Sequence, residues 1–231
     1  MKILITNDDG IKSIGIKLLT QEALKIADEV VVVCPSEEKS AISQGITIRN
    51  VVEIKKVEDI IEGVDTYTLN ATPADCVIFA LSNLNYKPDL VFSGINNGYN
   101  LGKNILYSGT VGSITEAALS GYKGIAFSAE IKQQENIKYF IDIYTYIIKE
   151  KLLEKYNLLN VNIPLNPKGI KMTHQGKCHE VSYFVESEDK NIYIPQYKKI
   201  ENVDLDDDSD IKTIENGYIS ITPLTEDRTK Y

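Results

Sequence analysis

Two short, uninterrupted runs of mostly β-branched residues limit the fold of this chain more than any other feature. They are Lys2–Thr6 (KILIT) and residues 29–34 (EVVVVC). Neither run alternates polar with apolar residues, which is typical of parallel strands covered by helices on both faces. Between the two runs, apolar residues recur with helical spacing, namely Ile14, Leu18, Leu19, Ala23, Ile26 and Ala27. A strand, a helix and a second strand predict a doubly wound α/β fold.

The alternation of strands and helices continues along the chain. We expect further elements, strand and helix in turn, at residues 65–69, 73–84, 89–93, after Thr110, and at 124–129. Thr72 suits the N-cap of the helix that begins at Pro73. Asp75 lies three residues after that cap, as in a capping box, so we assign it a structural role.

The sequence changes character after an amphipathic stretch at residues 136–156. Strand-like segments follow in turn-rich sequence, at residues 159–164, 181–185, 191–194 and 218–222. We interpret residues 180–196 as a hairpin that is too long to bury itself and packs on a partner chain. The acidic run at residues 204–210 is interpreted as a solvated loop that caps a helix start. The prediction is one domain over residues 1–231, with a Rossmann-like α/β core at 1–165 and an oligomerising hairpin, acidic loop and tail at 166–231.

Length and composition exclude several classes of protein. The chain has 231 residues, of which 43% are hydrophobic and 25% charged, as in ordinary globular proteins. It contains no apolar run of the roughly 20 residues that span a bilayer, and its first residues lack a signal-peptide pattern, so we expect no membrane partner and no secretion. The three cysteines, an odd number at unrelated spacings, favour a reducing cytoplasm: Cys34, Cys76 and Cys178.

The net charge of -8 comes largely from one segment. Without the six acids of residues 201–210, the chain has 25 basic and 27 acidic residues. Binding to DNA or RNA requires a basic surface that neutralises phosphates, and the sequence offers none. We therefore exclude polymeric nucleic acid as a partner.

Two adjacent acids, Asp8 and Asp9, directly follow the first predicted strand, and Gly10 permits a tight turn after them. In open α/β sheets, ligands bind beyond the carboxyl ends of the strands. Repulsion between the two carboxylates is relieved by a hard divalent cation such as Mg²⁺ or Mn²⁺. The alternative is a structural turn in which Asp9 caps the following helix.

The loops after two other strands should converge on the same edge of the sheet. They contribute hydroxyl and amide oxygens, from Ser36, Ser40, Ser43, Asn96, Asn97 and Asn100. The glycines at 94, 98 and 102 are spaced too widely for a dinucleotide fingerprint, and we expect them to let backbone approach a ligand. The alternative is an irregular surface loop.

Ser108, Gly109 and Thr110 directly precede a helical run, so free backbone amides and two hydroxyls should face the same cleft. Helix N-termini attract phosphate, which predicts an anion site here. The alternative is simple capping by Ser108 or Thr110. A serine hydrolase is excluded, because Ser108 does not lie in a G-x-S-x-G elbow and neither His174 nor His179 is an evident partner.

Taken together, these segments resemble the SurE family of stationary-phase survival proteins, which are metal-dependent 5'/3'-nucleotidases. The resemblance runs nearly end to end and rests on ILITNDDGI, CPSEEKSA, TPADCV, SGINNGYNLG, YSGTVGS and GYISITPL. It implies hydrolysis of nucleoside 5'-monophosphates and a fold whose C-terminal hairpin and tail exchange between subunits, giving a homodimer or homotetramer. Hydrolysis of 3'-monophosphates and a side activity on short polyphosphate stay open.

The resemblance also implies roles for individual residues. One divalent ion, Mg²⁺ or Mn²⁺, is bound in each subunit by Asp8, Asp9, Ser40 and Asn96. The phosphate is bound by Asn96, Asn100, Ser108, Gly109 and Thr110. Three departures from the family pattern, at Ala71, at residues 43–45 and at Asn104, leave these ligands in place but leave base preference undetermined.

The implied reaction is attack of water on the phosphorus, helped by the cation. Asp8 or Asp9 is the candidate proton acceptor, and the identity of the base stays open. Two alternatives place acids after the first strand: an aspartyl-phosphate phosphatase and a phosphorylation-sensing receiver module. The first requires acids two residues apart, and the second a lysine at the end of a late strand, where this chain has Ser128 and Ala129.

Overall fold

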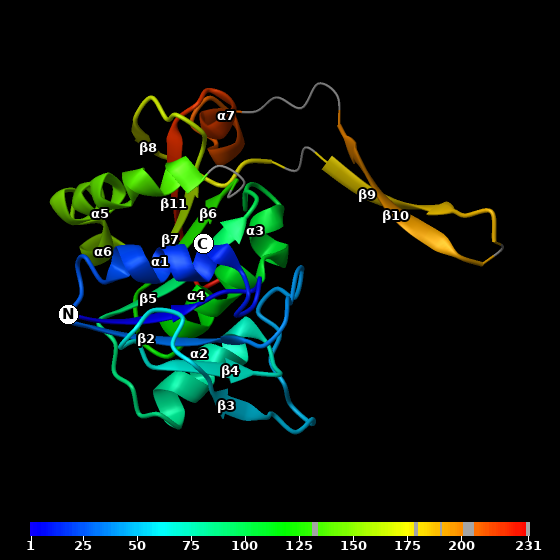
Figure 1. The fold of residues 1–231 in the computed structure, drawn as a ribbon. Helices are drawn as coiled ribbons and strands as arrows, with labels where there is room; N and C mark the ends of the chain where they lie inside the picture. Colours follow the sequence, from blue (N-terminus) through cyan, green and yellow to red (C-terminus); the bar gives the residue numbers. More distant parts are fainter. Residues whose placement is uncertain (131–133, 178–179, 190, 201–205, 230–231) are drawn as a thin grey trace.

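The computed structural model describes residues 1–130, 134–177, 180–189, 191–200 and 206–229. Within these residues the main sheet has nine strands, in the order β3-β4-β2-β1-β5-β6-β7-β11-β8. Figure 1 shows this sheet in the body of the molecule. Its strands are β1 (Lys2–Thr6), β2 (Glu29–Pro35), β3 (Ile54–Lys56), β4 (Thr66–Leu69), β5 (Leu90–Asn97), β6 (Gly124–Ala129), β7 (Leu158–Ile163), β8 (Ile170–Met172) and β11 (Ile219–Leu224).

Most neighbouring strands run parallel. β1 pairs in parallel with β2 on one side and with β5 on the other, while β3 with β4 and β7 with β11 are antiparallel. The chain therefore winds outward from β1 in both directions. Such a switch point, between β1 and β5, is where open α/β sheets bind ligands. The predicted fold class, a doubly wound and mostly parallel sheet with a C-terminal hairpin, is confirmed.

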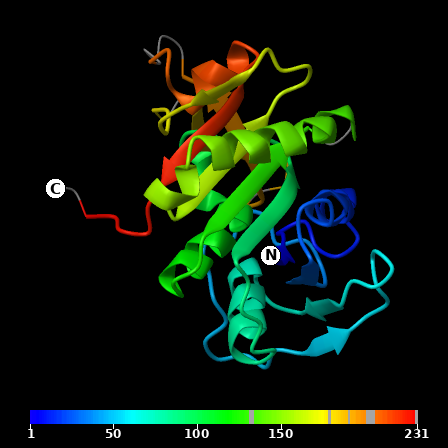
Figure 2. The same cartoon turned by 90° about the vertical axis from the view of Figure 1, so that its left-hand side faces the viewer.

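Helices cover both faces of the sheet. On β1, Ile3 and Ile5 pack in the cluster that contains α1 and α5, whereas Leu4 packs in the cluster that contains α2. Figure 2 shows α5 in front of the sheet. Burial of both faces explains why the strands lack polar alternation. The helices are α1 (Ile14–Ala23), α2 (Pro73–Ser82), α3 (Asn104–Tyr107), α4 (Gly109–Leu119), the 3₁₀ helix η1 (Gln134–Tyr139), α5 (Phe140–Lys149), α6 (Leu152–Lys155) and α7 (Asp210–Glu215).

Helix α2 begins as the sequence predicts. Thr72 Oγ1 accepts a hydrogen bond from the Asp75 amide at 3.1 Å, and Asp75 Oδ2 accepts one from the Thr72 amide at 3.0 Å. Asp75 also accepts a bond from the Thr47 amide at 2.9 Å. The capping box is therefore confirmed, and it ties a surface loop to the helix.

The acidic run differs from the prediction at its last member. Asp206, Asp207 and Asp208 are exposed, and Ser209 caps α7, but Asp210 is buried. Its carboxylate accepts hydrogen bonds at 2.8 Å from the amides of Gly102 and Gly176. The prediction that Asp210 is solvated is therefore wrong, because its carboxylate is buried and accepts hydrogen bonds from these two amides. Residues 201–205 of the run lie outside the described part.

The C-terminal segment contributes to two sheets. β8 and β11 extend the main sheet, while β9 (Glu180–Glu186) and β10 (Tyr193–Lys199) form an antiparallel hairpin that projects from the body in Figure 1. The predicted hairpin is present, and all residues of its two strands except Glu180 are exposed. The division of the chain at residue 165 stays a prediction, and the main sheet crosses it. Cys178 and His179 lie outside the described residues.

Candidate active site

A cavity of about 650 Å³ lies where β1 and β5 end. Six of the predicted site residues line it: Asp8, Asp9, Ser40, Asn96, Asn100 and Ser108. They come from the loops after β1 and β2, from the end and following loop of β5, and from the start of α4. The strand predicted at residues 89–93 extends to Asn97, so Asn96 lies within β5 and only Asn100 lies in the loop after it. The cavity therefore occupies the switch point of the sheet, as expected for a ligand site.

The carboxylate of Asp8 is buried and bound by the N-terminus of α4. Oδ2 accepts a hydrogen bond from the Thr110 amide at 3.0 Å, and Oδ1 accepts a short bond from the Thr110 hydroxyl. Burial raises the pKa of Asp8, while the bonds from Thr110 lower it. Gly109 permits this contact, since a Cβ there would lie 2.9 Å from the Asp8 Cβ. The positive end of the helix thus stabilises an acid of the chain itself.

This arrangement changes the predicted anion site. The Thr110 amide and hydroxyl bind Asp8, and the Val111 amide donates to the Ser108 hydroxyl at 3.1 Å. The expectation of free amides and hydroxyls at this helix start is therefore wrong for these groups. Ser108 caps α4, which is the alternative that the sequence left open.

Asp9 is only partly buried and lies beside the charge of Asp8. Its Oδ2 accepts a hydrogen bond from the Asn97 amide at 3.2 Å. Burial, followed by repulsion from Asp8 and Glu38, raises the pKa of Asp9 to about 6. Repulsion of this kind between neighbouring carboxylates is what a bound cation relieves.

The loop after β2 contributes one of its three candidate serines. Ser40 lines the cavity and donates its hydroxyl to Glu38, which also lines it. The Lys39 amide donates to the Asp8 carbonyl at 2.7 Å, which holds this loop against the end of β1. Ser36 is not among the residues lining the cavity, and Ser43 donates its hydroxyl to the Leu106 carbonyl at 2.6 Å.

Asn96, near the end of β5, and Asn100, in the loop after it, are held by hydrogen bonds through their side-chain nitrogens. Asn96 Nδ2 donates to the Gly98 carbonyl at 2.8 Å, and Asn100 Nδ2 donates to Ser128 Oγ at 2.9 Å. Both residues line the cavity. Because the nitrogens are engaged within the chain, the side-chain oxygens are the atoms left for a cation.

The donor set fits a hard cation. Within the described residues, no three His, Cys, Asp or Glu side chains are arranged to bind a metal. A cation in this cavity would therefore combine the carboxylates of Asp8 and Asp9 with hydroxyl and amide oxygens, such as those of Ser40 and Asn96. Mg²⁺ and Mn²⁺ prefer such oxygen ligands.

Several other residues that line the cavity were not predicted from the sequence. Among them are Glu38, Tyr99 and Lys103, which lie in the loops already identified, and Tyr107, which directly precedes Ser108. Their positions in or beside those loops were the one sequence feature that could have indicated a role in the site. Ser182 and Tyr197 of the hairpin also line the cavity, and no local pattern links them to it.

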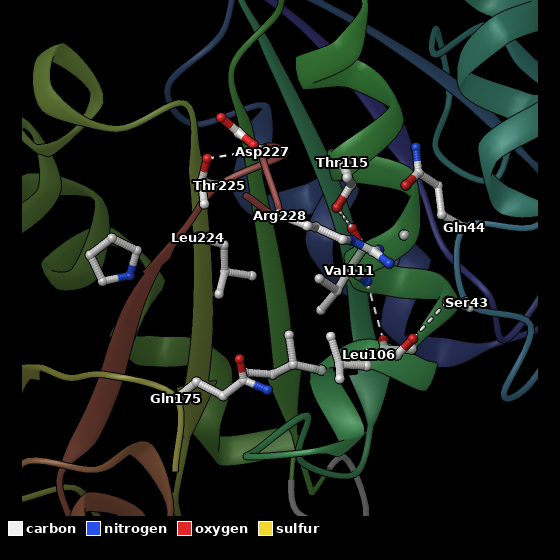
Figure 3. Close-up of a pocket in the computed structure, with 14 residues that line it drawn as sticks. Ser43, Gln44, Leu106, Val111, Thr115, Gln175, Leu224, Thr225, Asp227 and Arg228 are labelled. Carbon is white, nitrogen blue, oxygen red and sulfur yellow. Dashed lines mark hydrogen bonds between the residues drawn. The ribbon is translucent and has the colours of Figure 1, made fainter. Parts of the chain in front are cut away.

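A second cavity, of about 320 Å³, lies beside the opposite flank of α4. Ser108 lines both cavities, while Ser43 and Gln44 line only the second. In Figure 3, Leu224 and Arg228 of the C-terminal segment extend toward α4. None of the proposed cation ligands lines this space. It is therefore a separate feature of the fold.

Comparisons with known proteins all match one family. The family model described as "Survival protein SurE" matches residues 3–182. The chain is 42% identical to a 5'-nucleotidase SurE of Thermoanaerobacter sp. (strain X514), over all of this chain and 94% of that protein. It is 41% identical to a 5'-nucleotidase SurE of Petrotoga mobilis, over all of this chain and 95% of that protein. The crystal structure of a SurE protein from Aquifex aeolicus has a TM-score of 0.83 at 38% identity, covering all of this chain and 96% of that one.

Proposed function

The chain belongs to the SurE family, and we propose that it is a 5'-nucleotidase, which hydrolyses nucleoside 5'-monophosphates to nucleoside and phosphate. The observation that carries this proposal is the single cavity lined by Asp8, Asp9, Ser40 and Asn96 at the switch point. Its volume of about 650 Å³ lies in the range usual for small-molecule sites.

Each subunit would bind one divalent ion, Mg²⁺ or Mn²⁺, through Asp8, Asp9, Ser40 and Asn96. When bound, such an ion neutralises phosphate charge and lowers the pKa of a coordinated water. The acids Asp8, Asp9 and Glu38 outnumber the one lysine that lines the cavity, Lys103. Without a cation, this surplus of negative charge would repel a phosphate dianion.

We assign the phosphate to the cavity beside the start of α4, where Asn96, Asn100 and Ser108 line the wall and Gly109 and Thr110 hold Asp8. Thr110 then acts indirectly, by fixing the carboxylate of Asp8 through two hydrogen bonds. The ammonium of Lys103 adds a positive charge on the cavity wall.

Asp9 is the better candidate to accept the proton of the attacking water. Both oxygens of Asp8 already accept hydrogen bonds from Thr110, whereas Asp9 accepts one from Asn97.

The proposal also covers the assembly of the enzyme, its location and its substrate range. The exposed hairpin β9–β10 would join subunits into a homodimer or homotetramer, because an isolated two-stranded ribbon buries little. The enzyme would work in the cytoplasm, as Cys34 and Cys76 are free thiols. No helix of the described residues has the length and apolar character needed to cross a membrane. The substrate range would extend to 3'-monophosphates and short polyphosphate.

Phosphate release from AMP tests this function. We expect activity with Mg²⁺ or Mn²⁺, none in EDTA, and recovery when metal is returned. Asp8→Asn and Asp9→Asn should abolish release, while Asp207→Asn, at an exposed acid, should not. Full activity in EDTA would contradict the proposed cation. A trapped covalent phosphoenzyme would favour an aspartyl-phosphate mechanism, since attack by water leaves none.

A further inference from the structure

The root of the hairpin lies at the same cavity as the catalytic acids. Ser182 of β9 and Tyr197 of β10 are directly paired across the hairpin, and both line the cavity with Asp8 and Asp9. We call Ser182 and Tyr197 the hairpin root. The chemistry assigned to the acids does not use either residue, so their position requires another explanation.

The hairpin root is attached to the loop that follows β5. Lys103 Nζ donates a hydrogen bond to the Glu180 carbonyl, at the first residue of β9, at 2.7 Å. The neighbouring Gly102 is itself held by Asp210 at 2.8 Å. These contacts tie the base of the hairpin to the loop after β5, which carries Asn100.

Aromatic residues also line the cavity. Tyr197 and Tyr107 line it and are 71% and 57% exposed, so their rings are not packed in the core. Tyr99 also lines it and is partly buried. Exposed aromatic rings in a ligand cavity are suited to stacking with a flat ring system.

The size of the cavity leaves room for more than a phosphate. A cation with a few waters takes about 30 Å³ per water, whereas the whole cavity has about 650 Å³. The hairpin root forms part of the wall around the remaining volume. In a nucleoside monophosphate, the group attached to the phosphate is a sugar that carries an aromatic base.

We propose that the hairpin root binds the nucleoside part of the substrate, with the Tyr197 ring stacked on the base and the Ser182 hydroxyl hydrogen-bonded to the sugar or base. This inference rests on the proposed nucleotidase function and assigns the part of the substrate that the acids do not contact. Because every base has a π-face, stacking on Tyr197 predicts broad acceptance of different bases.

The test compares AMP with ribose 5-phosphate, which has the same sugar phosphate but no base. Tyr197→Ala should lower kcat/KM for AMP by about tenfold, mainly through KM, and leave kcat/KM for ribose 5-phosphate unchanged. Tyr197→Phe keeps the ring and should retain the wild-type value for AMP. Equal losses for both substrates, or no loss for AMP, would overturn the proposal.

Tyr193→Ala is the matched control. Tyr193 is on the same face of β10, is 55% exposed, and pairs with Glu186 at the far end of the hairpin. Tyr193 lies four residue steps along the strand from Tyr197, a distance of about 13 Å. It should not change kcat/KM for AMP, and size-exclusion chromatography should give all variants the same oligomeric state. If Tyr193→Ala matches Tyr197→Ala, the effect arises from the hairpin as a whole and the proposal is wrong.

The design separates this inference from the proposed function. If the wild-type enzyme with Mn²⁺ releases phosphate from neither compound, the nucleotidase proposal fails. The hairpin root is then judged from the affinity for AMP, measured by calorimetry. A tenfold weaker affinity of Tyr197→Ala would support its role as a nucleoside site, and an unchanged affinity would refute that role.

Discussion

The burial of Asp9 beside Asp8 should destabilise the metal-free protein at neutral pH, and the substitution Asp9→Asn tests this effect. The pKa of Asp9 is raised from 3.8 to about 6 in the folded state. The folded protein therefore holds a proton on Asp9 more strongly than the unfolded chain does. Ionisation of Asp9 costs folding free energy above about pH 6, and this cost disappears below about pH 4. Asparagine removes the charge and keeps an oxygen for the Asn97 amide.

The size of the effect follows from the shift. At 1.36 kcal/mol per pKa unit, the shift of Asp9 corresponds to about 3 kcal/mol at pH 7.5. Because Asp9 is partly exposed, solvent screening reduces this to about 1–3 kcal/mol. For a chain of this size, each kcal/mol changes Tm by about 2–4 °C. We therefore expect Asp9→Asn to raise Tm at pH 7.5 by at least about 2 °C, with little change at pH 4.

Thermal unfolding in EDTA, followed by circular dichroism at both pH values, measures this difference. Asp207→Asn, which neutralises an exposed acid, is the control for net charge and should shift Tm little. Added Mn²⁺ should then raise the Tm of the wild type more than that of Asp9→Asn, because the variant lacks a ligand. A variant less stable than the wild type at pH 7.5, or equally stabilised at both pH values, would refute the reasoning.

Three further substitutions test contacts around the cavity. Gly109→Ala places a Cβ 2.9 Å from the Asp8 Cβ, and should reduce the rate of AMP hydrolysis at least about tenfold while circular dichroism stays unchanged. Thr110→Val removes the hydroxyl bound to Asp8, and the loss of a charge-assisted bond should lower the free energy of unfolding in urea by about 1.5–3 kcal/mol. Asp210→Ala leaves the Gly102 and Gly176 amides unpaired, and should lower the free energy of unfolding in urea by at least about 3 kcal/mol.

The strands at the centre of the sheet were predictable from the sequence. The prediction matches β1 and β6 at both ends, and β2 to within one residue. These strands are buried on both faces, so their apolar character is continuous and their ends coincide with the first polar residues. Burial on both faces determines these strands, and the continuous apolar run in the sequence indicates that burial.

The peripheral elements were not predictable by the same argument. All three residues of β3 are exposed, and β8 has three partly buried residues. α3 is a single turn of four residues. Such elements depend on pairing with a neighbour and carry no periodicity of their own. Their sequences therefore contain too little signal to separate them from loops.

The candidate site was only partly predictable, for a related reason. The rule that ligands bind beyond the carboxyl ends of strands identified Asp8, Asp9 and Asn96 before any contact was known. It could not indicate that the amide of Thr110 would bind Asp8 instead of remaining free. That contact joins residues 102 positions apart, and it depends on the packing of α4 against β5 and β6.

The two ends of the cavity have different origins in the chain, and this difference has a functional consequence. The proposed cation ligands lie on loops held by the central sheet, where a displaced residue would disturb a buried helix start and a charged pair. The hairpin root lies on a ribbon whose residues are almost all exposed, so substitutions there cost little folding energy. Substrate preference can therefore change through the hairpin while the acids remain fixed. On this argument, differences in base preference between relatives should map to the positions of Ser182 and Tyr197 and not to those of Asp8 and Asp9.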